Sequence, residues 1–399
     1  ADGIGADGQP LEDRMRVALE QRPVHERTRV ALIGVHDHGF NNVSTYGNIL
    51  RLLRQGRLED SGGYAKACRL ALKLSGAVQA ARWTPLPENL GYIHSFNGSH
   101  SLFVDTIRSL RALALSHQLG HTLMGEQDQR ISLLARVLQH AETTARFTVY
   151  WGEVRDSYDV RGRTAHESIF NPKNGSYRCP GTQQGYSPFS TWTRGLAWAV
   201  LGFAELTEYL ATLADDAFSC DPGIYGGDKT RWIKRFVDAA AATADYFITS
   251  TATDGIPYWD TGAPGLASLP GWGDRPSDPF NAFEPVDSSA AAIAAQGLLR
   301  LGTYLKSKGD DSEGNRYIQA GLSVADTLFA APYLSEDEGH QGLILHSIYH
   351  RPNGWDYTPP GQQVPCGESS MWGDYHAREL ALMILGMAKG GTYYTFFDI

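Results

Sequence analysis

Residues 181–210 combine an arginine, two tryptophans and an amide within one short stretch. Arg194 follows Trp192 closely and lies four residues before Trp198, so a helix would place Arg194 and Trp198 on one face. Indole rings stack on the apolar faces of sugar rings, and a guanidinium binds a carboxylate through paired hydrogen bonds. Gln184 precedes them in a glycine-containing loop. The stretch favours a site for a flat, hydroxylated, anionic ligand, although two core tryptophans beside a salt-bridged arginine would have the same spacing.

Two aspartates elsewhere are candidates for acid–base chemistry. Asp37 lies in the cluster His36-Asp37-His38 before a glycine, and Asp105 lies near the start of a segment with helical spacing. A carboxylate at a helix start is favoured as the anion, so Asp105 acts as an acid only if burial or a like charge raises its pKa. The histidine cluster could bind a metal, but consecutive side chains diverge along a helix or strand. We therefore do not expect a metal site at this cluster.

The elements that must position these residues are mostly helices. Ser190 and Thr191 are expected to cap a helix that continues to Leu210, with an apolar stripe along one side. A hairpin or long loop is expected at residues 151–190. Further helices are expected at residues 11–19, in the second half of 35–60, and at 62–82, 103–114, 129–150, 229–250, 287–305, 313–330 and 372–388. Helical hairpins recurring through the chain predict one all-α domain, residues 1–399, shaped as an α/α toroid with the polar clusters at one end.

Composition limits the function classes. The chain has 399 residues, of which 42% are hydrophobic, and a net charge of -9, which argues against nucleic-acid binding. The four cysteines form no CxxC pair, so a zinc site is not expected. No apolar run is long enough to span a membrane. The start, ADGIGADGQP, lacks the pattern of a signal peptide, which leaves a cytoplasmic or a secreted location open.

Several segments taken together resemble glycoside hydrolase family 88, the unsaturated glucuronyl hydrolases. They keep the order of the family and extend over nearly the whole chain from residue 35. The matching segments are HDHGF and STYGN (36–48), YIHSFN and VDTIRSL (92–110), QGYSPFSTWTRGLAWAVLGFAE (184–205), PYWD (257–260), DSSAAAIAAQGLL (287–299), LHSIYHRP (345–352) and WGDY (372–375).

The resemblance implies an (α/α)6 barrel that works without metal or organic cofactor. It implies removal of a 4,5-unsaturated glucuronic acid from the non-reducing end of oligosaccharides that polysaccharide lyases produce. In this family the double bond is hydrated: C4 is protonated, water adds at C5, and the resulting hemiketal rearranges and releases the remaining saccharide. The partners implied are therefore unsaturated uronic-acid oligosaccharides, with no nucleic acid and no membrane, and we expect a monomer or homodimer.

The resemblance also implies roles for individual residues. Asp105 matches the catalytic aspartate and Asp37 the second conserved acid. If both face one cavity, their repulsion is expected to keep Asp105 protonated near neutral pH. The residues implied to contact the substrate are His36, Phe96, His166, Gln184, Trp192, Arg194, Trp198, Tyr349 and Trp372.

Three features depart from the family pattern. The first tryptophan is Trp83, so a segment resembling WTSGFFPG before the first acidic motif is absent, and we expect a shortened first helix. Phe96 stands where relatives carry tryptophan, which would alter stacking at the next subsite. The loop at 361–371 lacks a lysine, which favours an unsulfated substrate.

Four other interpretations remain open. An unsaturated rhamnogalacturonyl hydrolase would share the barrel and the chemistry. An ordinary inverting glycosidase would use Asp37 and Asp105 as acid and base across a water. A non-catalytic sugar-binding protein could keep the fold, although both aspartates are present. An epimerase would need paired histidines, and only His166 occurs in a matching motif.

Overall fold

The computed structural model describes residues 30–393 and residue 395. The helix expected at 11–19 lies outside these residues. The helices are, in chain order, α3 (His38–Asn42), the π-helix η1 (Val43–Gly47), α4 (Asn48–Arg54), α5 (Tyr64–Ala81), α6 (Thr106–Ser109), α7 (Arg111–Gln118), α8 (Leu133–Phe147), α9 (Thr193–Thr212), α10 (Lys229–Thr249), α11 (Ser288–Ser307), α12 (Asp311–Leu328) and α13 (Met371–Ala388). Short 3-10 turns are η2 (Glu126–Asp128), η3 (Asp215–Cys220), η4 (Pro264–Ser268), η5 (Trp272–Asp274) and η6 (Arg351–Asn353).

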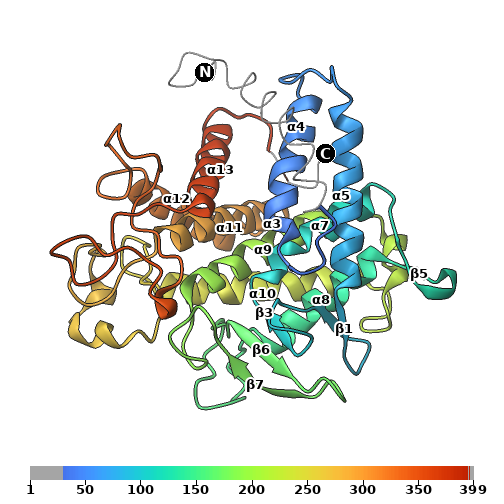
Figure 1. Cartoon of the computed structure of the whole chain (residues 1–399), viewed down its shortest axis with the longest axis horizontal. Helices are drawn as coiled ribbons and strands as arrows, with labels where there is room; N and C mark the ends of the chain where they lie inside the picture. The colour runs from blue at the N-terminus through green and yellow to red at the C-terminus, as the bar shows by residue number, and fades with distance from the viewer. Residues whose placement is uncertain (1–29, 394, 396–399) are drawn as a thin grey trace.

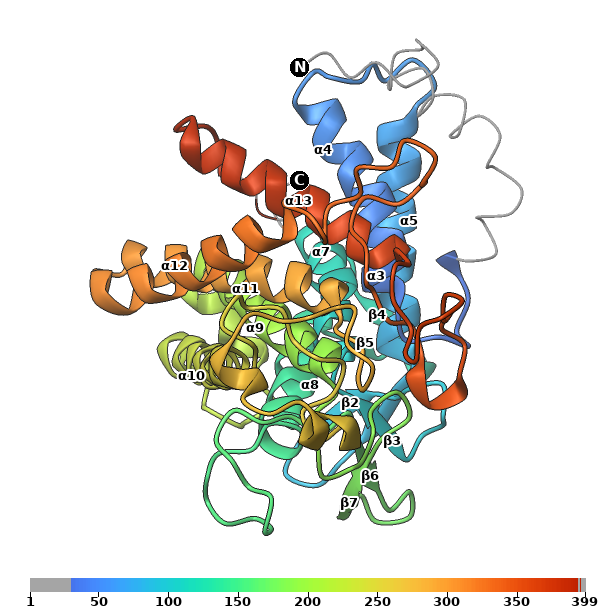
Figure 2. The same ribbon diagram turned by 90° about the vertical axis from the view of Figure 1, so that its left-hand side faces the viewer.

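Packed helix pairs make up most of the molecule (Figures 1 and 2). Helix α9 packs against both α10 and α11, and α11 also packs against α12 and α13. On the other side, α5 packs against α7, and α7 against α8. The all-α organisation expected from the helical spacing is confirmed. Each of these helix pairs contributes side chains to the hydrophobic core.

Helix α9 forms the centre of this packing. Every residue from Thr193 to Leu210 is buried, so the helix is enclosed on all sides and the expected one-sided stripe was too narrow a prediction. The expected cap was also wrong, because Trp192 is the N-cap residue and no side chain caps the helix. The residues before the helix are extended instead: Thr191 N–H donates to Thr261 Oγ1 at 3.0 Å, and Thr193 Oγ1 donates to the carbonyl of Tyr258 at 2.8 Å.

Short antiparallel strands accompany the helices, which the sequence patterns did not predict apart from the hairpin within 151–190. The strands are β1 (Trp83–Pro85), β2 (Gly91–Ile93), β3 (Ser101–Phe103), β4 (Leu123–Met124), β5 (Arg130–Ile131), β6 (Glu167–Phe170) and β7 (Tyr177–Gly181). They pair as β1–β2, β3–β6–β7 and β4–β5. The β6–β7 hairpin lies at the opposite end of the molecule from α4 (Figure 1).

The sheet that contains β3 positions a functional residue. Phe103 of β3 is opposite Glu167 of β6, and the N–H of Val104 donates to the carbonyl of His166 at 2.9 Å. Asp105 follows as the N-cap residue of α6, with helical backbone angles (φ -66, ψ -21). The strand pairing therefore fixes Asp105 beside His166, although 61 positions separate the two residues along the chain.

Candidate active site

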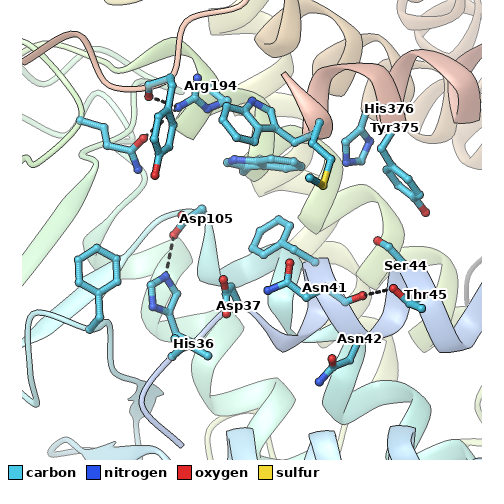
Figure 3. A pocket seen from close by; sticks show the side chains of 18 of the residues that line it. His36, Asp37, Asn41, Asn42, Ser44, Thr45, Asp105, Arg194, Tyr375 and His376 are labelled. Carbon is cyan, nitrogen blue, oxygen red and sulfur yellow. Dashed lines mark hydrogen bonds and ion pairs between the residues drawn. The ribbon is translucent and has the colours of Figure 1, made fainter. Parts of the chain in front are cut away.

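One cavity collects most of the residues that the sequence singled out. Its volume is about 620 Å³. Figure 3 shows Asp105 between Arg194 on one side and His36 and Asp37 on the other. The lining residues are Val35, His36, Asp37, Phe40, Asn41, Asn42, Ser44, Thr45, Tyr46, Phe96, Asp105, Gln184, Trp192, Arg194, Trp198, Tyr349, Met371, Trp372, Tyr375 and His376. Every substrate-contact residue implied by the resemblance lines it except His166.

Asp105 has a nearly buried carboxylate that faces His36. The side chain of Asp105 is 14% exposed, and its Oδ1 lies 3.7 Å from His36 Nε2, a contact longer than a hydrogen bond. Burial acts to raise the pKa of Asp105. The contact with His36, together with the nearby His166 and Arg194, outweighs burial and holds that pKa below its usual value.

Asp37 faces the same cavity from the start of α3. Its backbone carbonyl accepts from Phe40 N–H at 2.9 Å, while its Oδ1 is buried without a hydrogen-bond partner among the described residues. A buried carboxylate oxygen of this kind is suited to accept from a ligand hydroxyl. The expectation that Asp37 raises the pKa of Asp105 is wrong for the structure described, because the neighbouring His36, His166 and Arg194 outweigh burial and the shift is downward.

His166 lies behind the cavity wall, in ring contact with Phe103 and Trp192 at centroid distances of 4.6 Å each. Its Nδ1 accepts from the backbone N–H groups of Gln183 and Gln184 at 2.9 and 3.2 Å. Because an acceptor nitrogen carries no proton, the hydrogen of the neutral ring belongs on Nε2. Burial lowers the pKa of His166 to about 4, so the ring is neutral near pH 7.

Arg194 lies between two indoles, as expected, but the second is not the one expected. Its guanidinium carbon is 4.8 Å from the centroid of Trp192 and 5.1 Å from that of Trp372. Trp198 instead packs edge-on against Phe40, with centroids 4.7 Å apart, and both residues line the cavity. Trp372 comes from α13, far along the chain, so helical spacing within α9 could not reveal it.

The hydrogen bonds of Arg194 are made within the protein. Nη1 donates to Asp287 Oδ2 at 3.0 Å and to the carbonyl of Ile348, and Nη2 donates to Gln184 Oε1 at 2.9 Å and to the carbonyl of Tyr349 at 2.7 Å. These bonds occupy the four N–H groups of the two terminal nitrogens. Arg194 therefore supplies positive charge to the cavity without free terminal donors for a forked carboxylate contact, which differs from the expectation.

Gln184 is oriented by this arginine. Its Oε1 accepts from Arg194, so the amide nitrogen Nε2 is the end left to contact a ligand in the cavity. The side chain is thus a donor in a fixed direction beside a buried positive charge. A ligand carboxylate is the acceptor that this combination favours.

Phe96 and Tyr349 are the exposed aromatic members of the cavity, with 52% and 48% exposed area. Phe96 stacks on His36 with ring centroids 5.5 Å apart. Tyr349 lies 5.2 Å from Trp372, measured between ring centroids. Exposed aromatic side chains therefore line the same cavity as the two acids, which is the arrangement expected of a sugar site.

Sequence reasoning missed two contributions to this site. Asp287 was expected only as a helix cap; it caps α11, accepting from Ser289 N–H at 3.1 Å, and also holds Arg194. Ser44, Thr45 and Tyr46 line the cavity from the π-helix η1. A π-helical turn has no clear pattern in the sequence, although such turns are frequent at functional sites.

Neither a metal cluster nor a membrane span is found in the part of the chain that the structure describes. No group of three or more His, Cys, Asp or Glu side chains could hold a metal ion among residues 30–393 and 395. Within the same residues, no helix is both long and apolar enough to cross a bilayer. Cys68, Cys179, Cys220 and Cys366 form no disulfide bonds among the described residues.

Curated proteins of related sequence are sugar hydrolases. The unsaturated glucuronyl hydrolase of Bacillus sp. (strain GL1) is 30% identical over 238 residues, which are 59% of this chain and 50% of that enzyme. The unsaturated glucuronyl hydrolase of Formosa agariphila is 26% identical over 244 residues, 61% of this chain and 46% of that enzyme. The chain spans about half the length of these curated relatives in the matches. No protein-family model matches the sequence.

Solved structures extend the similarity over most of the chain. The unsaturated glucuronyl hydrolase from Bacillus sp. GL1 superposes with a TM-score of 0.61 at 23% identity, covering 97% of this chain and 81% of that one. An unsaturated glucuronyl hydrolase specific for heparin gives a TM-score of 0.66 at 20% identity, covering 94% and 82%. These enzymes have an (α/α)6 barrel, so the expected fold is confirmed. The expected shortening of the first helix concerns residues outside the described range and stays a prediction. Sequence and structural similarity together make this chain a relative of the unsaturated glucuronyl hydrolases.

Proposed function

We propose that the protein removes 4,5-unsaturated glucuronic acid from the non-reducing end of lyase-generated oligosaccharides by hydrating the C4=C5 bond. The observation that carries the proposal is the position of Asp105, buried in a cavity that also presents Asp37, the oriented amide of Gln184 and the charge of Arg194. This set contains an acid, a hydroxyl acceptor and a carboxylate site within one sugar-sized space.

The carboxylate of the unsaturated sugar is assigned to the Gln184 amide. Gln184 Nε2 donates to this carboxylate, and the buried positive charge of Arg194 stabilises it without paired hydrogen bonds from the guanidinium. The sugar ring then lies beneath the indole and phenol rings, with its hydroxyl groups toward Asp37. His166, whose carbonyl accepts from Val104 N–H next to Asp105, is neutral near pH 7 and adds no second positive charge.

Substrate binding is expected to raise the low pKa of Asp105. In the site without ligand, surrounding positive charges favour the Asp105 anion. A bound uronate brings a negative charge and displaces water, and both effects favour the protonated carboxyl. Binding of the acidic sugar is therefore coupled to uptake of one proton by Asp105, which is the proton that the reaction needs.

The reaction then proceeds with balanced protons. Protonated Asp105 donates to C4, and positive charge develops at C5 and the ring oxygen. Water adds to C5 and returns a proton to Asp105, so the carboxyl ends as it began. The C5 hemiketal opens to a ketone, which leaves a hemiacetal at C1 that expels the leaving saccharide. Asp37 holds the ring hydroxyls in place throughout.

The candidate substrates, glucuronyl and rhamnogalacturonyl fragments, differ in the saccharide that leaves. Unsaturation removes the C4 stereocentre, so glucuronyl and galacturonyl residues give the same unsaturated sugar. Discrimination against rhamnogalacturonyl fragments must come from contacts to the leaving sugar. Arg194 is the sole Lys or Arg among the described cavity-lining residues, and its terminal donors are engaged, which supports an unsulfated leaving sugar.

Ultraviolet absorbance tests the proposal. The C4=C5 chromophore disappears on hydration, so a panel of unsaturated disaccharides should lose absorbance while releasing the second sugar. Unsulfated glucuronyl disaccharides are expected to react fastest. Absence of any loss with glucuronyl and galacturonyl substrates alike would reject the proposal.

A further inference from the structure

A series of aromatic rings leads from the cavity to the surface. Trp372 and Tyr349 line the cavity, and their ring centroids are 5.2 Å apart. Trp355 lies next in the series, 5.4 Å from Tyr349 and tilted by 39°. Trp355 does not line the cavity and is 60% exposed, against 48% for Tyr349. An indole exposed to this extent, in ring contact with a residue that lines a sugar-sized cavity, is available to a ligand that projects from the cavity.

The turn that carries Trp355 is held in one shape. The carboxylate of Asp356 accepts from the backbone N–H groups of Tyr349 and His350, the latter at 3.0 Å. Gly354 ends η6 with a φ of 64°, a left-handed conformation that favours glycine. His350 also contacts the indole, with centroids 4.9 Å apart. Trp355 therefore lies on a turn whose backbone is fixed by hydrogen bonds, so little conformational entropy of the turn remains to be lost on binding.

The same turn is joined directly to the catalytic cavity. Arg194 donates to the carbonyl groups of Ile348 and Tyr349, the second at 2.7 Å. Arg194 also orients Gln184, to which we assign the substrate carboxylate. The position of the aromatic turn and the position of the unsaturated sugar are thus set by one buried guanidinium.

We propose that Tyr349 and Trp355 form a stacking platform for the leaving saccharide, with Trp355 as a residue that selects substrates having a pyranose ring next to the unsaturated uronate. This inference rests on the proposed function. The unsaturated sugar occupies the cavity beside Asp105, and the ring attached to it extends toward the exposed rings, of which Tyr349 and Trp355 lie together and Phe96 lies separately against His36. Trp and Tyr supply large, flat contact areas at low entropic cost.

The test compares two substrates that differ only in the leaving group. One is the methyl glycoside of the unsaturated uronate, which has no second ring, and the other is an unsaturated disaccharide with glucose as the leaving sugar. The enzymes are the wild type, Trp355→Ala, Trp355→Phe and the control Tyr158→Ala. Tyr158 is 50% exposed and stacks on Phe189 at 4.8 Å, but it lies outside the cavity lining.

Trp355→Ala is expected to lower kcat/KM for the disaccharide about five- to tenfold, the loss of roughly 40 Å² of apolar contact. The methyl glycoside should react within about twofold of wild type, Trp355→Phe should recover part of the loss, and Tyr158→Ala should behave as wild type on both substrates. Equal kcat/KM ratios for the two substrates in wild type and Trp355→Ala would overturn the platform and leave the proposed function standing, since the wild type would still be active. A wild type that converts neither substrate would overturn the function and, with it, the platform.

Discussion

The assignment of Gln184 makes a quantitative prediction, because its carbonyl oxygen is committed to Arg194 and only its amide nitrogen faces a ligand. Gln184→Glu keeps an acceptor for Arg194 at the same position, so the folded structure should be retained. It removes the donor and places a carboxylate opposite the carboxylate of the unsaturated sugar. The change therefore separates the contact to the ligand from the contact to the protein.

The size of the effect follows from two contributions. Loss of a hydrogen bond to a charged acceptor costs about 1.5–3 kcal/mol. Repulsion between two carboxylates about 4 Å apart at an effective dielectric constant of about 20 costs roughly 4 kcal/mol. Pairing of the new carboxylate with Arg194 at the 2.9 Å contact offsets part of this repulsion. We expect kcat/KM to fall by about 10³, equal to about 4 kcal/mol.

The assay measures kcat/KM by loss of ultraviolet absorbance with the unsaturated disaccharide and with its methyl ester, which carries no charge. Gln184→Met is the uncharged comparison: it removes the donor and also the acceptor for Arg194 without adding charge, and it should lose about 10- to 100-fold on the acid. Gln184→Glu should lose far less on the ester than on the acid. Equal losses on both substrates, or an unaltered kcat/KM on the acid, would refute the placement of the carboxylate at Gln184.

Three further predictions follow from the same site. Asp105→Asn should lower kcat by at least about 10³ with unchanged thermal unfolding, and an active variant would remove Asp105 from the mechanism. Asp105 must be protonated to act, and its pKa lies below the usual value. The value of kcat/KM should therefore fall about tenfold per pH unit above that pKa. A kcat/KM that stays constant or rises between about pH 5 and 8 would contradict this. Arg194→Lys leaves all donors on one nitrogen, which cannot reach Asp287, Gln184 and Tyr349 together. The free energy of unfolding, measured in urea, should therefore fall by about 2–4 kcal/mol. A decrease of less than about 1 kcal/mol would show that these contacts are weak.

The helices were the most predictable part of the fold, because their apolar spacing is local. The cap of α11 at Asp287 also followed from residue type alone. The start of α9 did not: Ser190 and Thr191 have the chemistry of N-caps, yet pairing of residues 191–193 with 258–261 extends the chain until Trp192. A tertiary contact decided the helix boundary, and local propensity could not report it.

At the site, the sequence predicted which residues take part but not which residues they contact. The motifs identified Arg194, Gln184, Asp37 and Asp105, and the structure brings all four to one cavity. The motifs did not show that Arg194 makes its terminal hydrogen bonds within the protein, because Asp287 and the carbonyl of Tyr349 come from distant segments.

The direction of the pKa of Asp105 was mispredicted for the same reason. Its effective neighbours are His36, His166 and Arg194, brought together by the start of α3, the β3–β6 pairing and α9, while the sequence drew attention to Asp37 alone. Charge balance at a buried site depends on every group packed around it, and those groups are set by the fold.

The most direct test of hydration is the reaction of an unsaturated disaccharide in deuterated water, with the product examined by NMR at C4. If Asp105 protonates C4 within the cavity, product sampled before the C4 hydrogens exchange through the adjacent C5 ketone carries one deuterium at a single one of the two C4 positions, and Asp105→Asn shows no such incorporation. An enzyme that cleaves at C1 would instead release the unsaturated sugar intact, and its later spontaneous conversion would place deuterium on both faces. In product sampled at these early times, deuterium at a single C4 position is the predicted result, and deuterium at both C4 positions would contradict it.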